Sequence, residues 1–341
     1  MSYSSTTTSK RLSHKILLNV QSGKTLTMTE IILFNHLHNG DLFASKGFVN
    51  NFCDQVAPCA VNVKYLHINH PKVLSDLPVT YQPIASDPVM HVPNIMQQKM
   101  FSVQNKIYIN TWVGPYLKYY SLDNTVSDDL FPGINYRSYH YIWNHICNEL
   151  NKIAPWNLSV SPDIWQSIAE IDREKFAGQW VDMFLNQGNW KYRILVSNGP
   201  VHSQQAYTNH NMAELLLPLI QKYIDVQWVF TAPTDLTLPN VIHTNDIIPC
   251  EGLRCDLNEI GILSEHCDVI IGRNSGPFLF TNTRKNLENA GKIFLALGKK
   301  EEESFPWNMN VPARFYWMQD QNDNQVKSFI ETVLHAKYHF T

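Results

Sequence analysis

The sequence is poor in charge and in cysteine. Charged residues make up 17% of the 341 residues, and the formal net charge is −3. Proteins that bind a nucleic-acid backbone usually carry a concentrated basic excess, so this composition argues against a nucleic-acid partner. The six cysteines are spaced at C-x5-C and C-x4-C at their closest, which matches no zinc-site pattern. We expect reduced and mostly buried thiols.

Long apolar runs are also missing. The longest apolar stretches, 212–220 and 292–298, fall far short of the roughly 20 residues that a membrane-spanning helix needs. Residues 1–12 are polar and rich in serine and threonine, without the apolar core of a secretory signal. These absences predict a soluble cytoplasmic protein with no transmembrane segment.

Apolar and aromatic residues, in contrast, are plentiful. Hydrophobic residues make up 44% of the chain and aromatic residues 12%, a composition that collapses and packs. The length corresponds to about two domains of roughly 150 residues each. We therefore predict the following organisation: a flexible tail at 1–13, a first domain at 14–154, a linker and bridging helix at 155–190, a second domain at 191–323 and a C-terminal helix at 324–341.

Both halves alternate between strand-like and helix-like segments. In the first half we predict strands at 31–34, 62–68 and 106–113, a helix after the first of them and an amphipathic helix at 135–153. In the second half we predict strands at 192–197, 226–232, 240–246, 267–272, 292–298 and 313–319, with helices at 212–220, 257–266, 278–291 and 324–340. This βαβ pattern predicts an α/β fold with a parallel sheet in each domain.

The first candidate site is the loop HLHNGD (36–41), which follows a predicted strand. Asp41 there can act as a general base on an acceptor hydroxyl, and Gly40 removes a side chain where the backbone turns. The alternative is that Asp41 is an ordinary helix N-cap. His36 and His38 alternate on extended backbone and point apart, so we predict no joint metal site.

The second candidate is the polar loop 197–211, and the third is the loop GRNSGP (272–277). Both follow predicted strands and precede predicted helices, where backbone N–H groups can bind a phosphoryl oxygen. The loop 197–211 has neither a P-loop nor a nicotinamide-type glycine pattern. An ordinary polar surface loop and a capped turn are the alternatives. The residues that we expect to bind a phosphorylated ligand are Ser197, Asn198, Gly199, Ser203, Gln204, Arg273, Asn274, Ser275 and Gly276.

An aromatic cluster in the first half, including Trp112 and Tyr116, is a candidate platform on which a sugar ring stacks, with core packing as the alternative. The adjacent acidic residues Asp128 and Asp129 do not alternate on a strand edge, so we do not interpret them as a metal-binding carboxylate pair. We predict no metal site and no cofactor.

Two of these segments resemble a known family. HLHNGDLF (36–43) and LNEIGILSEHCDVIIGRNSGP (257–277) resemble the heptosyltransferase-type glycosyltransferases of family 9. The resemblance implies the GT-B fold, in which two Rossmann-like parallel-sheet domains face a cleft. At three points the sequence departs from the family pattern. Arg273 and Asn274 stand where the family commonly has an Asn-Asp pair, no histidine follows Pro277 in the next helix, and the diphosphate loop lacks a matching basic residue.

The resemblance also implies a division of labour. The first domain would bind the acceptor, with Asp41 as the activating base and with His38, Gly40, Trp112 and Tyr116 around it. The second domain would bind a nucleotide-sugar donor, with its diphosphate on the loop 197–208 and Asn274 to Gly276 in the same site. The predicted function is an inverting, metal-independent hexosyl- or pentosyltransferase of glycan biosynthesis. The alternatives are a nucleotide-sugar epimerase of the same fold and a catalytically silent carbohydrate- or nucleotide-binding protein.

Overall fold

The computed structural model describes residues 30–59, 61–68, 71–117, 134–200, 209–249, 256–273, 276–319 and 322–338. The chain divides into two compact units. Unit 1 contains the described residues of Met1–Phe131 together with Arg137–Ser167, and unit 2 contains those of Pro132–Tyr136 together with Ile168–Thr341. The backbone therefore passes between the units at two described places, next to Tyr136 and after Ser167.

Unit 1 is built on a five-stranded sheet in the order β3-β2-β1-β5-β4. Its elements are β1 (Glu30–Asn35), α2 (Asn39–Val56), β2 (Asn62–His67), β3 (Thr80–Pro83), β4 (Met100–Val103), β5 (Lys106–Asn110) and α3 (Tyr136–Ile153). The strands are parallel except β4, which runs antiparallel to β5. The predicted strands β1, β2 and β5 and the predicted helix α3 are confirmed. Strands β3 and β4 were not predicted; they have four residues each and are only partly buried.

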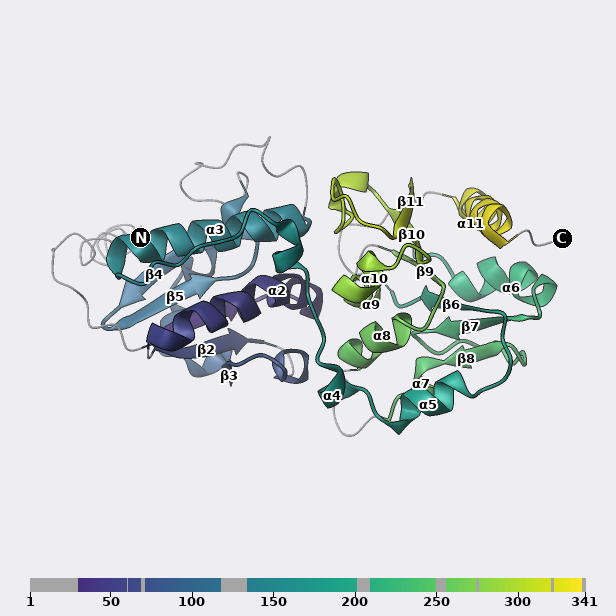
Figure 1. Cartoon of the computed structure of the whole chain (residues 1–341), viewed down its shortest axis with the longest axis horizontal. Helices are drawn as coiled ribbons and strands as arrows, with labels where there is room; N and C mark the ends of the chain where they lie inside the picture. The colour runs from purple at the N-terminus through teal and green to yellow at the C-terminus, as the bar shows by residue number, and fades with distance from the viewer. Residues whose placement is uncertain are drawn as a thin grey trace, which may run out of the picture. The chain divides into compact units, whose positions relative to one another are not determined.

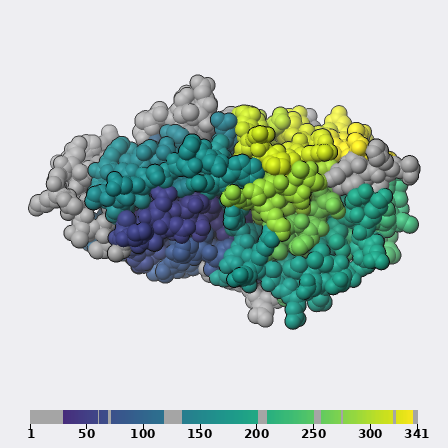
Figure 2. Space-filling view, in the orientation of Figure 1, coloured from purple at the N-terminus to yellow at the C-terminus, as the bar shows by residue number. Residues whose placement is uncertain are grey.

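Both faces of this sheet are covered. Helices α2 and α3 lie side by side (Figures 1 and 2), and the rings of Phe48 and Tyr139 stack between them with their centroids 6.4 Å apart. Side chains of the strands such as Phe34 and Tyr108 form a second cluster with Met90 and Ile95, from the short 3-10 helices between β3 and β4. All six residues of β1 are buried, as expected for a central strand of a parallel sheet.

Unit 2 is built on a six-stranded sheet in the order β11-β10-β9-β6-β7-β8, and each pairing is parallel. Its strands are β6 (Tyr192–Ser197), β7 (Val226–Phe230), β8 (Val241–His243), β9 (Val269–Arg273), β10 (Ile293–Gly298) and β11 (Arg314–Gln319). Its helices are α4 (Arg173–Phe176), α5 (Gln179–Leu185), α6 (Met212–Lys222), α7 (Thr244–Ile247), α8 (Leu257–Ser264), α9 (Gly276–Phe280), α10 (Arg284–Glu288) and α11 (Asp323–Tyr338). Helices α6 and α11 lie together over one face of the sheet, where Leu216 and Ile330 join the same core as Trp228 (Figure 1).

The helix predicted at 278–291 is wrong as one element, because the structure divides it into α9 and α10. The side chain of Asn282 donates to the carbonyl oxygen of Phe278 at 3.0 Å, and Thr283 accepts from the N–H of Asn286 as the N-cap of α10. Short polar side chains compete in this way with the helical hydrogen bonds of the backbone. Between 155 and 190, a 3-10 turn at Ile164–Ser167 and the short helices α4 and α5 stand in place of one bridging helix.

The strand orders define one topological switch point in each unit. In unit 1 the chain moves from β1 outward through β2 and β3, and β5 then pairs with the other side of β1. In unit 2 it moves from β6 outward through β7 and β8, and β9 pairs with the other side of β6. Ligands of parallel sheets bind beyond the carboxyl ends of the strands at such points. All three candidate loops of the sequence analysis therefore leave a strand at a switch point.

Candidate functional site

Asp41 lies at the switch point of unit 1. The side-chain oxygen of Asn35, the last residue of β1, accepts a hydrogen bond from the N–H of Leu37 at 2.9 Å and turns the chain toward α2. The N-cap of α2 is His38, in extended backbone and without a side-chain capping bond, and Asp41 is the third residue of the helix. The alternative role of Asp41 as the N-cap residue is therefore wrong.

The carboxyl group of Asp41 lies in surroundings that disfavour its charge. Burial raises its pKa from 3.8 to about 6, and the nearby His38 ring and the N–H groups of His38 and Asp41 oppose this effect. Such a carboxyl group is still ionised at neutral pH but binds a proton much more readily than an exposed aspartate does. A general base works best when its pKa is near the working pH.

Three buried polar atoms belong to the segment that joins β1 to α2. Asn35 Nδ2, His36 Nδ1 and Asn39 Oδ1 are buried and have no hydrogen-bond partner among the described residues. Most buried polar atoms in folded proteins are paired, so these three are candidates for contact with a polar ligand. Asn35 and Asn39 were not predicted as site residues, although both follow the carboxyl end of a predicted strand, where ligands of parallel sheets bind.

A second group of polar side chains lies between the ends of β2 and β5. The hydroxyl groups of Tyr65 and Thr111 are hydrogen-bonded at 2.5 Å. Burial raises the pKa of Tyr65, and the charge of Asp41 adds to this shift, so the phenol stays protonated. Burial lowers the pKa of His67 to about 4, which keeps its ring neutral at physiological pH. These residues were missed because the sequence does not show which strand ends become neighbours.

The predicted acceptor residues have different positions. His38 is exposed, and Gly40 lies in the first turn of α2. The partly exposed ring of Trp112 meets the His36 ring edge-on, with centroids 5.0 Å apart. Tyr116, in contrast, is fully buried and its hydroxyl group donates to the carbonyl oxygen of Asn110 at 2.9 Å. Tyr116 therefore belongs to the core and offers no stacking surface, as the packing alternative held.

The switch point of unit 2 lies between Ser197, which ends β6, and the end of β9. Ser197 pairs with Gly272, and a Cβ atom on Gly272 would lie 2.8 Å from the Ser197 Cβ atom and 2.6 Å from the ring of Phe278. Only glycine allows this close approach, so Gly272 fixes the spacing of the two strands and of α9. Ser197 is 5% exposed.

The other predicted donor residues are only partly described. The side chain of Asn198 is held by Ala232, whose N–H donates to Asn198 Oδ1 at 2.7 Å while Asn198 Nδ2 donates to the Ala232 carbonyl oxygen at 3.0 Å. At both Gly199 and Gly276, an added Cβ atom meets no atom of the described residues within 4 Å. Helix α9 has only five residues, so it supplies little helix dipole to an anion. The predicted residues Ser203, Gln204, Asn274 and Ser275 lie outside the described residues.

Arg273 was predicted as a donor ligand, but its guanidinium group contacts protein. It is 2% exposed, and it donates from Nη1 to Asn209 Oδ1 and from Nη2 to the carbonyl oxygen of Gly199, both at 2.6 Å. The structure therefore joins three parts of the predicted donor site through one buried cation.

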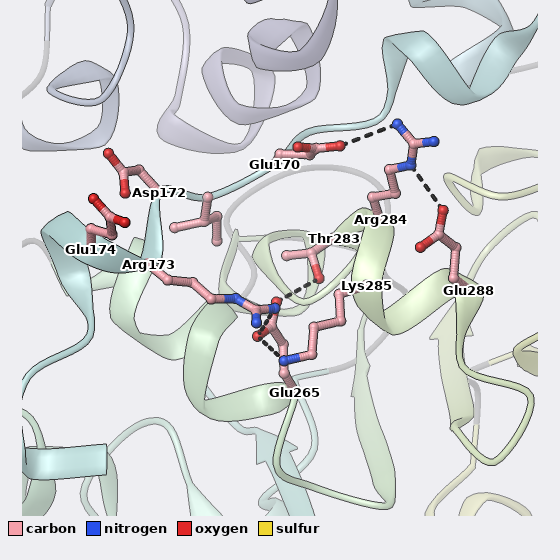
Figure 3. A pocket seen from close by; sticks show the side chains of 10 residues that line it. Glu170, Asp172, Arg173, Glu174, Glu265, Thr283, Arg284, Lys285 and Glu288 are labelled. Carbon is pink, nitrogen blue, oxygen red and sulfur yellow. Dashed lines mark hydrogen bonds and ion pairs between the residues drawn. The ribbon is translucent and has the colours of Figure 1, made fainter. Parts of the chain in front are cut away.

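A pocket of about 650 Å³ also lies in unit 2, beside α4 and α10 (Figure 3). Arg173 and Lys285 converge on Glu265 with N–O distances of 2.5 and 3.3 Å. Arg284 extends to Glu170 and Glu288. The pocket residues thus form ion pairs with one another, and none of them is a predicted site residue.

The described residues contain no group of three or more His, Cys, Asp or Glu side chains arranged to hold a metal ion. Among the same residues, no helix is both long enough and apolar enough to cross a membrane. The four described cysteines are unpaired: Cys53, Cys147 and Cys267 are buried and Cys59 is partly exposed.

The strand orders define a protein of two Rossmann-like α/β units, the predicted fold class. No family model and no curated protein matches the chain. Similar solved structures include a family 9 glycosyl transferase from Veillonella parvula (13% identity, 90% of each chain, TM-score 0.49) and ADP-heptose heptosyltransferase II from E. coli (12%, 91% of this chain and 99% of the other, 0.49). A putative UDP-N-acetylglucosamine 2-epimerase from Listeria monocytogenes is also similar (9%, 92% and 90%, 0.45).

The similar solved structures thus include family 9 glycosyltransferases, the family whose motifs the sequence resembles. With TM-scores below 0.5 and identities of 9 to 13%, however, these likenesses decide neither fold nor activity. The fold class follows from the strand orders of this chain, and its activity is proposed from the side chains at the two switch points.

Proposed function

We propose that the protein is an inverting, metal-independent glycosyltransferase that moves a sugar from a nucleotide-sugar to a hydroxyl group of a glycan or another acceptor. The acceptor binds at the switch point of unit 1 and the donor at the switch point of unit 2. The observation that carries this proposal is the position of Asp41 beyond the end of β1: burial raises the pKa of its carboxyl group to about 6, and three buried polar atoms without partners among the described residues belong to the same segment between β1 and α2.

The reaction assigns a separate task to each unit. In unit 1 the Asp41 carboxylate accepts the proton of the acceptor hydroxyl group, and the oxygen of that hydroxyl group forms a bond to the anomeric carbon of the donor sugar. The bond from that carbon to the donor phosphate breaks, and the nucleoside diphosphate leaves with the electron pair. In unit 2, Ser197 and the backbone near Gly199 and Gly276 supply polar groups and open space for the diphosphate.

Ligand binding is the first test. A thermal-shift screen against nucleoside diphosphates and nucleotide-sugars should find one base that stabilises the folded protein. A ligand at about 100 times its dissociation constant adds about 2.7 kcal/mol to the free energy of unfolding. Absence of any such ligand would contradict a nucleotide-sugar site.

Product analysis then separates the proposed transferase from the two alternatives. With the stabilising donor alone, an epimerase converts the sugar, and a silent binding protein leaves it unchanged. A transferase forms a glycoside only when an acceptor is added, and NMR of the product shows inversion at the anomeric carbon.

Metal independence is a separate prediction. We expect transfer to continue in EDTA, because the sequence offers no convincing strand-edge carboxylate pair and polar loop groups are expected to meet the diphosphate charge. Initial rates measured before and after chelation are the test. Complete loss of activity that magnesium or manganese restores would show that the donor site is misassigned.

The rate should also depend on pH in a defined direction. The base acts in its ionised form, so kcat/KM should fall as the pH drops through about 6 and decrease about tenfold for each further unit. A profile of kcat/KM from pH 5 to 8 measures this limb. A rate that stays constant down to pH 5 would exclude Asp41 as the titrating group.

A further inference from the structure

The chain that leaves β6 and the chain that enters α6 are both held by Arg273. Arg273 ends β9, and Gly272 before it pairs with Ser197 at the end of β6. This register brings the arginine side chain beside the residues that follow Ser197. Nη2 donates to the carbonyl oxygen of Gly199, and Nη1 donates to the side-chain oxygen of Asn209, each at 2.6 Å.

The fork geometry of the guanidinium group suits this task. Its N–H groups are planar and fixed in direction, so one cation holds two acceptors at a set separation, which a lysine ammonium group does less well. The side chain is 2% exposed, so water competes little for these bonds. Both acceptors are neutral oxygens, one of the backbone and one of a side-chain amide.

The residues next to Asn209 are anchored as well. The side chain of His210 is fully buried, and its Nδ1 atom is hydrogen-bonded to Asp323 of α11. Asn211 is the N-cap of α6 and accepts from the N–H of Glu214. On the β6 side, Asn198 is fixed to Ala232 at the end of β7. Arg273 therefore connects two anchored chain ends across the switch point.

We propose that Arg273 is a positioning residue of the donor site, which holds Gly199 and Asn209 at a fixed separation and so sets the backbone at Gly199, where the proposed function places the diphosphate. This role depends on the proposed function for its ligand, but the contact itself does not. In this positioning role, Arg273 acts on the donor through Gly199 and Asn209 and makes no contact with the phosphate.

The test uses Arg273→Lys and Asn209→Ala in the full chain. Asn209 is exposed, so its substitution should fold even if the arginine variant does not. Without ligand, hydrogen–deuterium exchange of peptides covering 192–200 and 209–222 should become faster in both variants. The dissociation constant of the stabilising nucleoside diphosphate should rise about tenfold, while kcat at saturating donor changes less than threefold.

Arg193 offers a matched control on the neighbouring strand. Its guanidinium group also donates to a backbone carbonyl oxygen, that of Leu185, and to a side-chain amide oxygen, that of Gln227, each at 3.0 Å. It lies at the start of β6, so Arg193→Lys should leave donor affinity and exchange at 209–222 unchanged. The double variant Arg273→Lys/Asn209→Ala should lose less affinity than the product of the two single losses, because each substitution already removes the same contact between Arg273 and Asn209.

The outcomes separate this inference from the proposed function. Unchanged exchange in both variants overturns the positioning role, whatever the donor does. Faster exchange with unchanged donor affinity overturns the link to the donor site. If the wild-type protein binds no nucleoside diphosphate, the proposed function fails, and the link to a donor fails with it, while faster exchange would still show that Arg273 holds the two chain ends.

Discussion

Asp41→Asn should lower the transfer rate by roughly 10²- to 10⁴-fold while the protein stays folded. Asparagine has the size of aspartate and can still accept the N–H bonds at the start of α2, but it does not take a proton from a hydroxyl group. The effect should appear in kcat/KM and in kcat, because proton transfer occurs in the transition state. Initial rates with saturating donor, together with circular dichroism of the variant, measure both parts.

The stability of the same variant can be predicted from the sign of the pKa shift. The folded-state pKa of Asp41 is raised, so its contribution to stability is fully present below pH 3.8 and is lost as the pH rises to about 6. Above pH 6 the ionised carboxylate is a cost to the folded state. Asp41→Asn should therefore leave the melting temperature at pH 7.5 unchanged or raise it.

Asp54 provides the control for the loss of any carboxylate from α2. It is exposed on the same helix, so Asp54→Asn should change neither the rate nor the melting temperature measurably. Near-normal turnover of folded Asp41→Asn protein would contradict its role as the base. Equal rate losses in both variants would indicate a general effect of charge on α2.

The fold was predictable where a segment carries its own signal. β1 and β9 are short apolar runs, and their complete burial in parallel sheets follows from that composition. The helix predicted at 278–291 failed because Asn282 and Thr283 bond to local backbone, which an apolar count does not register. β4 was missed because its pairing with β5 is what stabilises a four-residue strand.

The site was predictable to the level of loops but not of contacts. Asp41 was selected because it follows a strand, and the strand order then placed it at a switch point. Whether Tyr116 faces solvent or the core depends on distant residues such as His145, whose ring meets it edge-on. The role of Arg273 depends on Gly199 and Asn209, 74 and 64 positions earlier in the chain. No local pattern encodes such pairs.

Gly276→Val should raise the dissociation constant of the donor by roughly 10- to 100-fold and leave acceptor binding nearly unchanged. Gly276 follows β9 at the switch point of unit 2, and an added Cβ atom there meets no atom of the described residues within 4 Å. We expect a side chain at this position to occupy the volume that a phosphate or ribose needs, and such steric conflicts typically cost 1–3 kcal/mol. Isothermal titration of each ligand against the folded variant measures both constants.

Backbone strain must be separated from this steric effect, because Gly276 has a φ of +36°, a conformation that is strained for residues other than glycine. Gly188, with a φ of +105°, is the control position: it precedes β6 on the side of the strands' amino ends, and an added Cβ atom there would lie 3.2 Å from Trp190 Nε1. Gly188→Ala should lower the melting temperature without weakening donor binding, whereas Gly276→Ala should do both. Both alanines would take a positive φ, but only the alanine at position 276 lies beyond the carboxyl ends of the strands. A loss of donor affinity confined to Gly276 therefore assigns the donor to the carboxyl ends of β6 and β9. Unchanged donor affinity with weakened acceptor binding would assign the acceptor to unit 2 instead.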